Sequence, residues 1–312
     1  MILKCTPVFQ ERLWGGRKLA SRFNYEIPDG PIGECWGISG HPNGMSIIET
    51  GHYAGYSIER LWSEERELFG DYTLAKFPLL VKILDAEKDL SVQVHPSDEQ
   101  AFELEGEAYG KTECWYVIEA EKDAEIILGH TARTKEALRE SIEQAEWSTL
   151  LRTQRVKAGD FIFVPSGTIH AIGKGIVVLE TQQSSDTTYR LYDFDRIDDV
   201  GEKRVLHLEQ AFNVITTPDV TFYGRTETKQ VTNAEITTLI KVPEFNVYHV
   251  KVKDGFVLKP LERFRTITIL NGHGEIENVP VQAGDHFIIP QGQAPRNCMG
   301  TFEFIMSDVE VR

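Results

Sequence analysis

The chain has 312 residues, 41% of them hydrophobic, and a formal net charge of −15. This length predicts about two folded domains, and the negative charge argues against nucleic acid as a general partner, because phosphate contacts need a basic surface. No apolar run reaches the roughly 18 residues of a membrane span, and the N-terminus lacks the apolar stretch of a signal peptide. We therefore expect a cytoplasmic protein without membrane contact, whose four scattered cysteines are reduced thiols.

Strand patterns dominate the chain. They are short runs rich in β-branched and aromatic residues, and turn residues bound most of them. In chain order they cover 78–86, 89–95, 114–120, 124–130, 161–165, 176–183, 236–242, 245–252, 264–270, 286–290 and 301–306. Several short strands at close spacing are typical of barrels and sandwiches. The sequence therefore predicts a mainly β protein.

Helical patterns are few. They cover 57–70, 97–104, 134–151 and 207–215. Ser57 is a good N-cap, and Gly70 suits the position after a helix C-terminus. Ser97 with Gln100 forms a capping-box pattern. We expect these pieces to be small helical insertions on β domains.

One segment of the chain is repeated. VKAGDFIFVPSGTIH (156–170) aligns without a gap with VQAGDHFIIPQGQAP (281–295), and Val, Ala, Gly, Asp, Pro and Gly recur in place. The first copy has the turn, strand and turn of the second cupin motif, with His170 in the ligand place. Pro295 stands there in the second copy. The repeat therefore predicts two cupin-type β-barrels (jelly rolls), of which the first keeps the ligand.

The division between the two barrels is predicted in the polar, turn-rich segment near 215–232. We accordingly assign 1–220 to an N-terminal catalytic, metal-binding cupin domain that carries the short helical insertions. We assign 221–312 to a degenerate C-terminal barrel without metal.

Four residues spread over about 80 positions form a candidate metal site: Gln93, His95, Glu113 and His170. Gln93 and His95 are two apart in an alternating segment, so a strand points both side chains to one face. Glu113 and His170 lie beside other strand-like runs. Any single histidine in a strand is more often a hydrogen-bonded partner than a ligand. Together, however, two imidazoles, a carboxylate and an amide oxygen predict a divalent metal with a vacant position for substrate.

Several segments resemble the type I mannose-6-phosphate isomerases (phosphomannose isomerases), especially their short bacterial form. They are RLWGG (12–16), GECWGIS (33–39), FPLLVKILDAEKDLSVQVHP (77–96), YGKTECWYV (109–117), AGDFIFVPSGTIHAI (158–172) and SSDTTYRLYDF (184–194). The resemblance implies a zinc-dependent aldose–ketose isomerase that interconverts mannose 6-phosphate and fructose 6-phosphate through an enediol. It implies one Zn²⁺ per chain, a small sugar phosphate as partner, and a monomer or homodimer.

The same resemblance assigns residues. The family's zinc ligands fall on the four residues named above. Its active-site arginine falls on Arg190 and its active-site lysine on Lys111. Ser91, Lys82 and Asp186 match substrate-binding positions, and Glu180 matches a catalytic carboxylate.

Other interpretations remain open at this point. The proton-transferring base is Glu180, Lys111 or a metal-bound water. A non-catalytic sugar-phosphate-binding cupin is an alternative, although the full ligand set together with Arg190 and Lys111 argues against it. An iron or manganese cupin dioxygenase is a weaker alternative, because Gln93 is a poor ligand for stabilising a redox metal.

Overall fold

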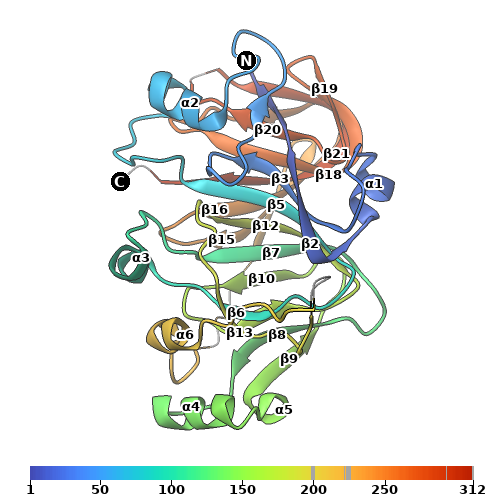
Figure 1. Cartoon of the computed structure of the whole chain (residues 1–312). Helices are drawn as coiled ribbons and strands as arrows, with labels where there is room; N and C mark the ends of the chain where they lie inside the picture. The colour runs from blue at the N-terminus through green and yellow to red at the C-terminus, as the bar shows by residue number, and fades with distance from the viewer. Residues whose placement is uncertain (198–200, 221, 223–225, 293, 311–312) are drawn as a thin grey trace.

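The computed structural model describes residues 1–312 except 198–200, 221, 223–225, 293 and 311–312. About 44% of the chain is strand and 15% helix, so the prediction of a mainly β protein is confirmed. The described strands form three sheets, and the five-stranded sheet lies below the six-stranded sheet in Figure 1. None of the helices that the structure describes has the length and apolar character of a membrane span.

The first barrel consists of two facing sheets. The six-stranded sheet runs in the order β10-β7-β12-β5-β2-β3 and the five-stranded sheet in the order β13-β6-β11-β8-β9. The six-stranded sheet contains β2 (Val8–Gly16), β3 (Ile32–Ser39), β5 (Leu79–Ala86), β7 (Glu113–Ala120), β10 (Phe161–Val164) and β12 (Ile176–Gln183). The five-stranded sheet contains β6 (Val92–Val94), β8 (Glu125–His130), β9 (Leu151–Arg155), β11 (His170–Ile172) and β13 (Tyr189–Tyr192).

The second barrel is built from the ten-stranded sheet, which runs β14-β15-β16-β21-β18-β20-β1-β4, with β17 on β21 and β19 on β18. Its strands are β1 (Leu3–Thr6), β4 (Ile47–Ile48), β14 (Glu227–Val231), β15 (Ala234–Lys241), β16 (Asn246–Val252), β17 (Phe256–Leu258), β18 (Arg265–Ile276), β19 (Val279–Gln282), β20 (His286–Ile289) and β21 (Arg296–Asp308). β1 and β4 come from the start of the chain, and β1 pairs with β20. Two strands from the first 48 residues thus belong to the sheet of the C-terminal part. In Figure 1, β18 and β20 of this sheet lie above the six-stranded sheet, while β15 and β16 appear at its own height. The division of the chain at residue 220 stays a prediction.

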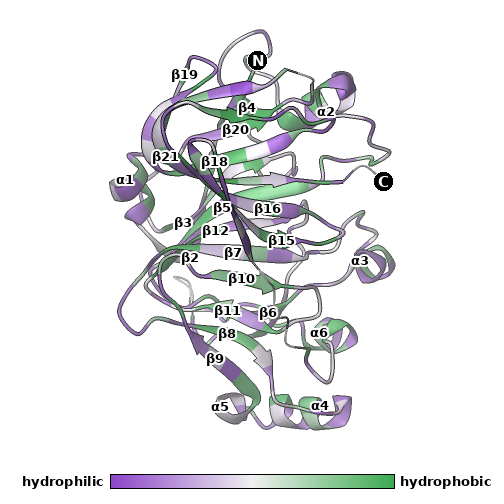
Figure 2. Cartoon of the chain, turned by 180° about the vertical axis from the view of Figure 1, so that it is seen from behind, coloured by the Kyte–Doolittle hydropathy of each residue, from purple (hydrophilic) through white to green (hydrophobic). Residues whose placement is uncertain are grey.

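The six-stranded sheet is buried on both faces. Every residue of β3, β5 and β12 is buried. One face packs between the barrels, where Val81 and Leu179 join a core that includes Leu239 and Ile305. The other face packs inside the first barrel. A strand covered on both sides has a nearly continuous apolar sequence, as LLVKILDA has in β5, and Figure 2 shows hydrophobic stretches along the central strands. Charged residues in such a strand therefore need partners.

The helices lie outside the sheets (Figure 1). They are α1 (Lys18–Phe23), α2 (Ile58–Glu64), the 3₁₀ turn η1 (Arg66–Leu68), α3 (Asp98–Glu105), α4 (Lys135–Glu143), α5 (Trp147–Leu150) and α6 (Leu208–Val214). The capping box of Ser97 and Gln100 is present in α3, as predicted. The single helix predicted over 134–151 is wrong. The chain turns at Ala145, which has φ +55°, and this break lets Trp147 stack on Tyr192 with ring centroids 4.7 Å apart.

The repeated segment has the same local structure in both barrels. The backbone N–H of Lys157 donates to Asp160 Oδ2 at 2.9 Å, and that of Gln282 donates to Asp285 Oδ2 at 3.0 Å. The glycine before each aspartate has φ +90°, a conformation that favours glycine. The predicted duplication is thus present in the backbone as well as in the sequence.

Candidate metal centre and active site

The four candidate ligands come together inside the first barrel. Gln93 on β6 pairs directly with His170 on β11, and Glu113 begins β7 in the opposite sheet. His95 follows β6. The ligand atoms of His95, Glu113 and His170 lie within 4.8 Å of one another, and all three residues are buried. The local strand register therefore gathers residues that are far apart in the sequence.

Backbone contacts orient both imidazole rings. His95 Nδ1 donates to the carbonyl oxygen of Thr187 and His170 Nδ1 to that of Thr168, each at 2.9 Å. This leaves the two Nε2 atoms as lone-pair donors, 3.5 Å and 3.2 Å from the carboxylate oxygens of Glu113. Burial holds the pKa of His95 well below its usual range and lowers the pKa of His170 to about 4. Both rings are therefore neutral near pH 7, the form that binds metals.

Glu113 is the residue whose surroundings point most directly to a cation. Its side chain is buried, and neither carboxylate oxygen makes a hydrogen bond to any described residue. The ammonium of Lys111 lies 3.2 Å from Oε2 and donates to His95 Nε2 at 3.0 Å. A buried carboxylate without donors is costly unless positive charge compensates it. Two lone-pair imidazoles beside this carboxylate fit a divalent metal.

Gln93 completes the set. Its side-chain amide nitrogen lies 3.4 Å from His170 Nε2. A half-turn of the amide exchanges its nitrogen and oxygen, so Oε1 can take that place and act as a neutral ligand. The residues present therefore fit Zn²⁺ as a group of two imidazoles, one carboxylate and one amide oxygen.

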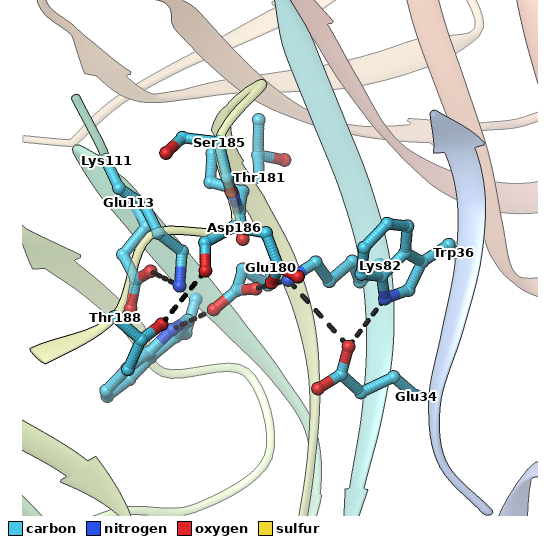
Figure 3. Close-up of polar contacts among 12 residues, drawn as sticks. Glu34, Trp36, Lys82, Lys111, Glu113, Glu180, Thr181, Ser185, Asp186 and Thr188 are labelled. Atoms are coloured by element: carbon cyan, nitrogen blue, oxygen red, sulfur yellow. Dashed lines mark hydrogen bonds and ion pairs between the residues drawn. The ribbon is translucent and has the colours of Figure 1, made fainter. Parts of the chain in front are cut away.

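A second charged cluster lies beside the metal centre on the six-stranded sheet (Figure 3). The Lys82 ammonium is 3.3 Å from Glu180 Oε2 and 3.9 Å from Glu34 Oε2. Trp115 Nε1 donates to Glu180 Oε1 at 3.0 Å. Lys82 is only 3% exposed. Burial, together with the nearby charge of Glu113, raises the pKa of Glu180, which makes this carboxylate more basic than an exposed one.

A cavity of about 390 Å³ connects the two clusters. Seven of the predicted site residues line it: Lys82, Ser91, Gln93, Lys111, Glu180, Asp186 and Arg190. The remaining three contact residues that line it: His95 and Glu113 contact Lys111, and His170 contacts Gln93. Asp186 accepts a hydrogen bond from Asn43 Nδ2 at 3.1 Å. The structure thus places seven of the ten predicted residues on the wall of one cavity and the other three in contact with that wall.

One end of the cavity is cationic. Arg190 Nε donates to Ser91 Oγ at 3.2 Å, and Nη1 donates to the carbonyl oxygen of Val205 at 3.0 Å. Arg204 also lines this end, where its side chain donates to Asp193. The two guanidinium groups suit an anionic group of a ligand.

Sequence reasoning missed several residues of the site. Glu34, Arg12, Trp115 and Arg204 all line the cavity. Arg12 Nε donates to Glu34 Oε1 at 2.8 Å, so Glu34 links Arg12 to Lys82. The inward lysine in an apolar strand indicated that an acidic partner exists. Its identity depends on the pairing of β3 with β5, which the sequence does not specify.

Comparison with known proteins agrees with this geometry. The family described as phosphomannose isomerase type I, catalytic domain, matches residues 2–144, and the mannose-6-phosphate isomerase cupin domain matches residues 235–309. Mannose-6-phosphate isomerase ManA of Bacillus subtilis is 48% identical over 305 residues, which are 96% of each chain. The chain belongs to the type I phosphomannose isomerases. A mannose-6-phosphate isomerase of Streptococcus mutans is 47% identical over 306 residues, which are 95% of each chain.

Solved structures of phosphomannose isomerases have the same architecture. A mannose 6-phosphate isomerase from Bacillus subtilis superposes with a TM-score of 0.96 at 43% identity and covers 99% of both chains. A variant of the phosphomannose isomerase from Salmonella typhimurium has a TM-score of 0.79 at 14% identity, which shows the fold alone. The predicted family and the cupin fold are confirmed.

Proposed function

We propose that this type I phosphomannose isomerase is a zinc-dependent aldose–ketose isomerase that interconverts D-mannose 6-phosphate and D-fructose 6-phosphate. The observation that carries the proposal is the buried His95, Glu113 and His170 cluster, which contacts the Lys111 and Gln93 side chains of a cavity with a cationic end. The names of the relatives from Bacillus subtilis and Streptococcus mutans support the substrate.

One zinc ion would be held by Gln93, His95, Glu113 and His170. With two neutral imidazoles, a neutral amide and one carboxylate, a bound Zn²⁺ keeps a net charge near +1 and supplies a Lewis acid that polarises substrate oxygens. Zinc has no redox chemistry, which suits an isomerisation. Lys111, which contacts both His95 and Glu113, holds a second positive charge at the same place.

The phosphate group would bind at the cationic end of the cavity. Arg190 and Arg204 supply guanidinium groups there, and Ser91 supplies a hydroxyl. Arg190 is fixed by its bonds to Ser91 and to the Val205 carbonyl, so its orientation is set before substrate arrives. This arrangement leaves the other end of the sugar over the metal centre.

Glu180 is the group that we assign to proton transfer between C2 and C1. Its carboxylate lines the cavity, and burial raises its pKa, which makes it a stronger base than an exposed carboxylate. Trp115 and Lys82 hold one oxygen each, which fixes the carboxylate in position. Lys111 would then stabilise negative charge on the substrate oxygens as the enediol forms.

The test is a coupled assay of mannose 6-phosphate turnover on protein of known metal content. We expect activity to fall after chelation and to return with one equivalent of zinc. A zinc-loaded protein that binds the sugar phosphate without turnover would instead identify the non-catalytic alternative. Oxygen consumption with bound iron would identify the dioxygenase.

The cytoplasmic location and the monomeric or homodimeric state belong to this proposal as well. Light scattering of the purified zinc-loaded chain measures the oligomeric state directly. A tetramer or larger assembly would contradict it.

A further inference from the structure

The second barrel has counterparts of the metal-ligand positions, and strand register identifies them. In the first barrel, Val164 of β10 pairs with Glu113 of β7. In the second, Ile289 of β20 pairs with Arg265 of β18. Val164 and Ile289 occupy the same place in the sequence repeat. A guanidinium therefore stands where the first barrel has its ligand carboxylate.

The opposite wall shows a similar replacement. His170 pairs with Gln93 in the first barrel, and the repeat puts Pro295 in the place of His170. In the second barrel β17 and β21 pair Leu258 with Arg296. One step further along this register lie Lys259 and Pro295. The position of Gln93 is therefore taken by a lysine, and no counterpart of the imidazole remains there.

The result is a small cavity with a cationic lining. It has a volume of about 10 Å³ and is lined by Lys259, Arg263, Arg265 and Arg296, together with Pro260, Leu261, Ile289, Pro290, Gly292 and Ala294. Arg265 is 7% exposed. Its Nη1 donates to the carbonyl oxygen of Lys259 at 2.7 Å. The Nε atoms of Arg265 and Arg296 are both buried, and neither has a hydrogen-bond partner among the described residues.

Asp308, an acidic residue close to these cations, already accepts hydrogen bonds from other residues. Asp308 Oδ1 accepts from Arg263 Nε at 2.9 Å and from Asn246 Nδ2 at 2.8 Å. The negative charge of Asp308 stabilises the charged form of Arg265, whereas the positive charges of Arg263 and Arg296 destabilise it. Burial lowers the pKa of Arg265. A buried guanidinium with an unsatisfied N–H is costly, and a bound anion would remove that cost.

We propose that this counterpart of the metal centre is an oxyanion site, which takes a phosphate or carboxylate group between Arg265 and Arg296. A cavity of this size admits about one atom the size of a water oxygen. One oxygen of the anion enters and accepts from the two Nε–H groups, and the rest of the group lies outside, near the Lys259 ammonium. The duplicated barrel has thus exchanged cation binding for anion binding. This site is separate from the proposed isomerase activity and does not depend on it.

Selenate, a tetrahedral dianion with an anomalous signal, is the probe that locates the site. Crystals of the zinc-loaded protein are soaked with selenate, and the anomalous map is inspected at Arg265 and at the catalytic cavity. We expect a peak within hydrogen-bond distance of the Arg265 and Arg296 side chains. A peak in the catalytic cavity alone, or a map in which water occupies the small cavity at every selenate concentration, overturns the proposal.

Sulfate titration by calorimetry measures the site in solution. The zinc-loaded Arg190→Ala variant is the background, because it weakens anion binding in the catalytic cavity. Adding Arg296→Gln should weaken the remaining sulfate binding by about tenfold, since a charge-assisted hydrogen bond is lost. Lys253→Gln, an exposed lysine of the same barrel, is the matched control and should leave the binding unchanged. Equal affinities in the two double variants would contradict the proposal.

Activity separates this proposal from the isomerase proposal. The single variant Arg296→Gln should keep its zinc and its turnover of mannose 6-phosphate at low salt, because Arg296 does not line the catalytic cavity. Loss of sulfate binding with full turnover supports the anion site whatever the mechanism of the isomerase. If folding of Arg296→Gln fails, Lys259→Gln, which changes an exposed residue, should weaken sulfate binding at least threefold. Unchanged binding in that variant would also overturn the proposal.

Discussion

The first barrel encloses Lys82, Glu113 and Glu180, whereas the second encloses Ile267, Ile269 and Phe287. Both barrels contain the same turn and strand, with the same aspartate-to-backbone hydrogen bond. The shared turn and strand therefore do not determine which side chains fill the space between the sheets. In the first barrel each buried charge has an opposite charge nearby, as Lys82 has in Glu180 and Glu34. In the second barrel the core is apolar, and the buried charges Arg265 and Asp308 lie outside that apolar cluster.

The largest expected effect comes from making the first barrel resemble the second at a ligand position. His170→Ala removes one of two imidazoles, and we expect zinc and isomerase activity to be lost together. Metal analysis and the coupled assay on one sample measure both. His52→Ala, an exposed histidine outside the cavity, is the control. Normal zinc content in His170→Ala would show that His170 is not a ligand.

Arg190→Ala should separate substrate binding from metal binding. Zinc content should stay normal, because the Arg190 side chain bonds to Ser91 Oγ and to the Val205 carbonyl oxygen, and its pairing with Gln93 is through the backbone, which the substitution keeps. We expect kcat/KM to fall roughly a hundredfold to a thousandfold, since a charged donor to the substrate is lost. Steady-state kinetics on the zinc-loaded variant give this number. A loss below tenfold would exclude Arg190 as an essential substrate contact.

Phe287→Ala should destabilise the second barrel without changing the metal content of the first. Phe287 is fully buried in the apolar core of that barrel. Truncation leaves a cavity and should lower the free energy of unfolding by about 3–5 kcal/mol. Urea denaturation measures the loss, and the folded variant should keep its zinc. A loss of metal from the folded protein would mean that the second barrel supports the metal centre directly.

The smallest expected effect concerns His286, which lies where the barrels meet. Thr268 Oγ1 and Tyr25 Oη contact its ring nitrogens at 2.9 Å and 3.0 Å, and Cys35 Sγ lies 3.8 Å away. Burial lowers the pKa of His286 to about 3. An unfolded histidine has a pKa of about 6.5, so the unfolded chain binds the extra proton first as the pH falls. The fold therefore loses stability progressively as the pH falls from about 6.5 to about 3, and the loss persists below pH 3.

His286→Gln should remove that component. Between pH 6.5 and pH 5 the natural protein should lose about 2 kcal/mol more unfolding free energy than the variant. Urea denaturation of both proteins at the two pH values measures the difference. Parallel losses in the two proteins would show that His286 does not titrate in this way.

Much of the fold could be predicted because its signals are local. The run from 176 to 183 was predicted as a strand and is β12. The capping box at Ser97 formed as its sequence indicates. The first strands of the chain, β1 to β4, were not among the predicted strands. The helix predicted over 134–151 is interrupted at Ala145, and beyond the break Trp147 packs on Tyr192, a contact between residues 45 apart that the local pattern does not indicate.

The sequence by itself determined the strand pattern, the duplication, the family and the chemical types of the ligands. These follow from neighbouring residues, whose alternation and turn chemistry act over a few positions. Tertiary structure alone decided that Glu34 is a partner of Lys82, that the Glu113 carboxylate forms an ion pair with Lys111 but no hydrogen bond to a described residue, and that Arg265 stands in the place of Glu113. Each of these depends on the register between strands distant in the chain. Register is set by burial of whole sheet faces, which no single segment specifies.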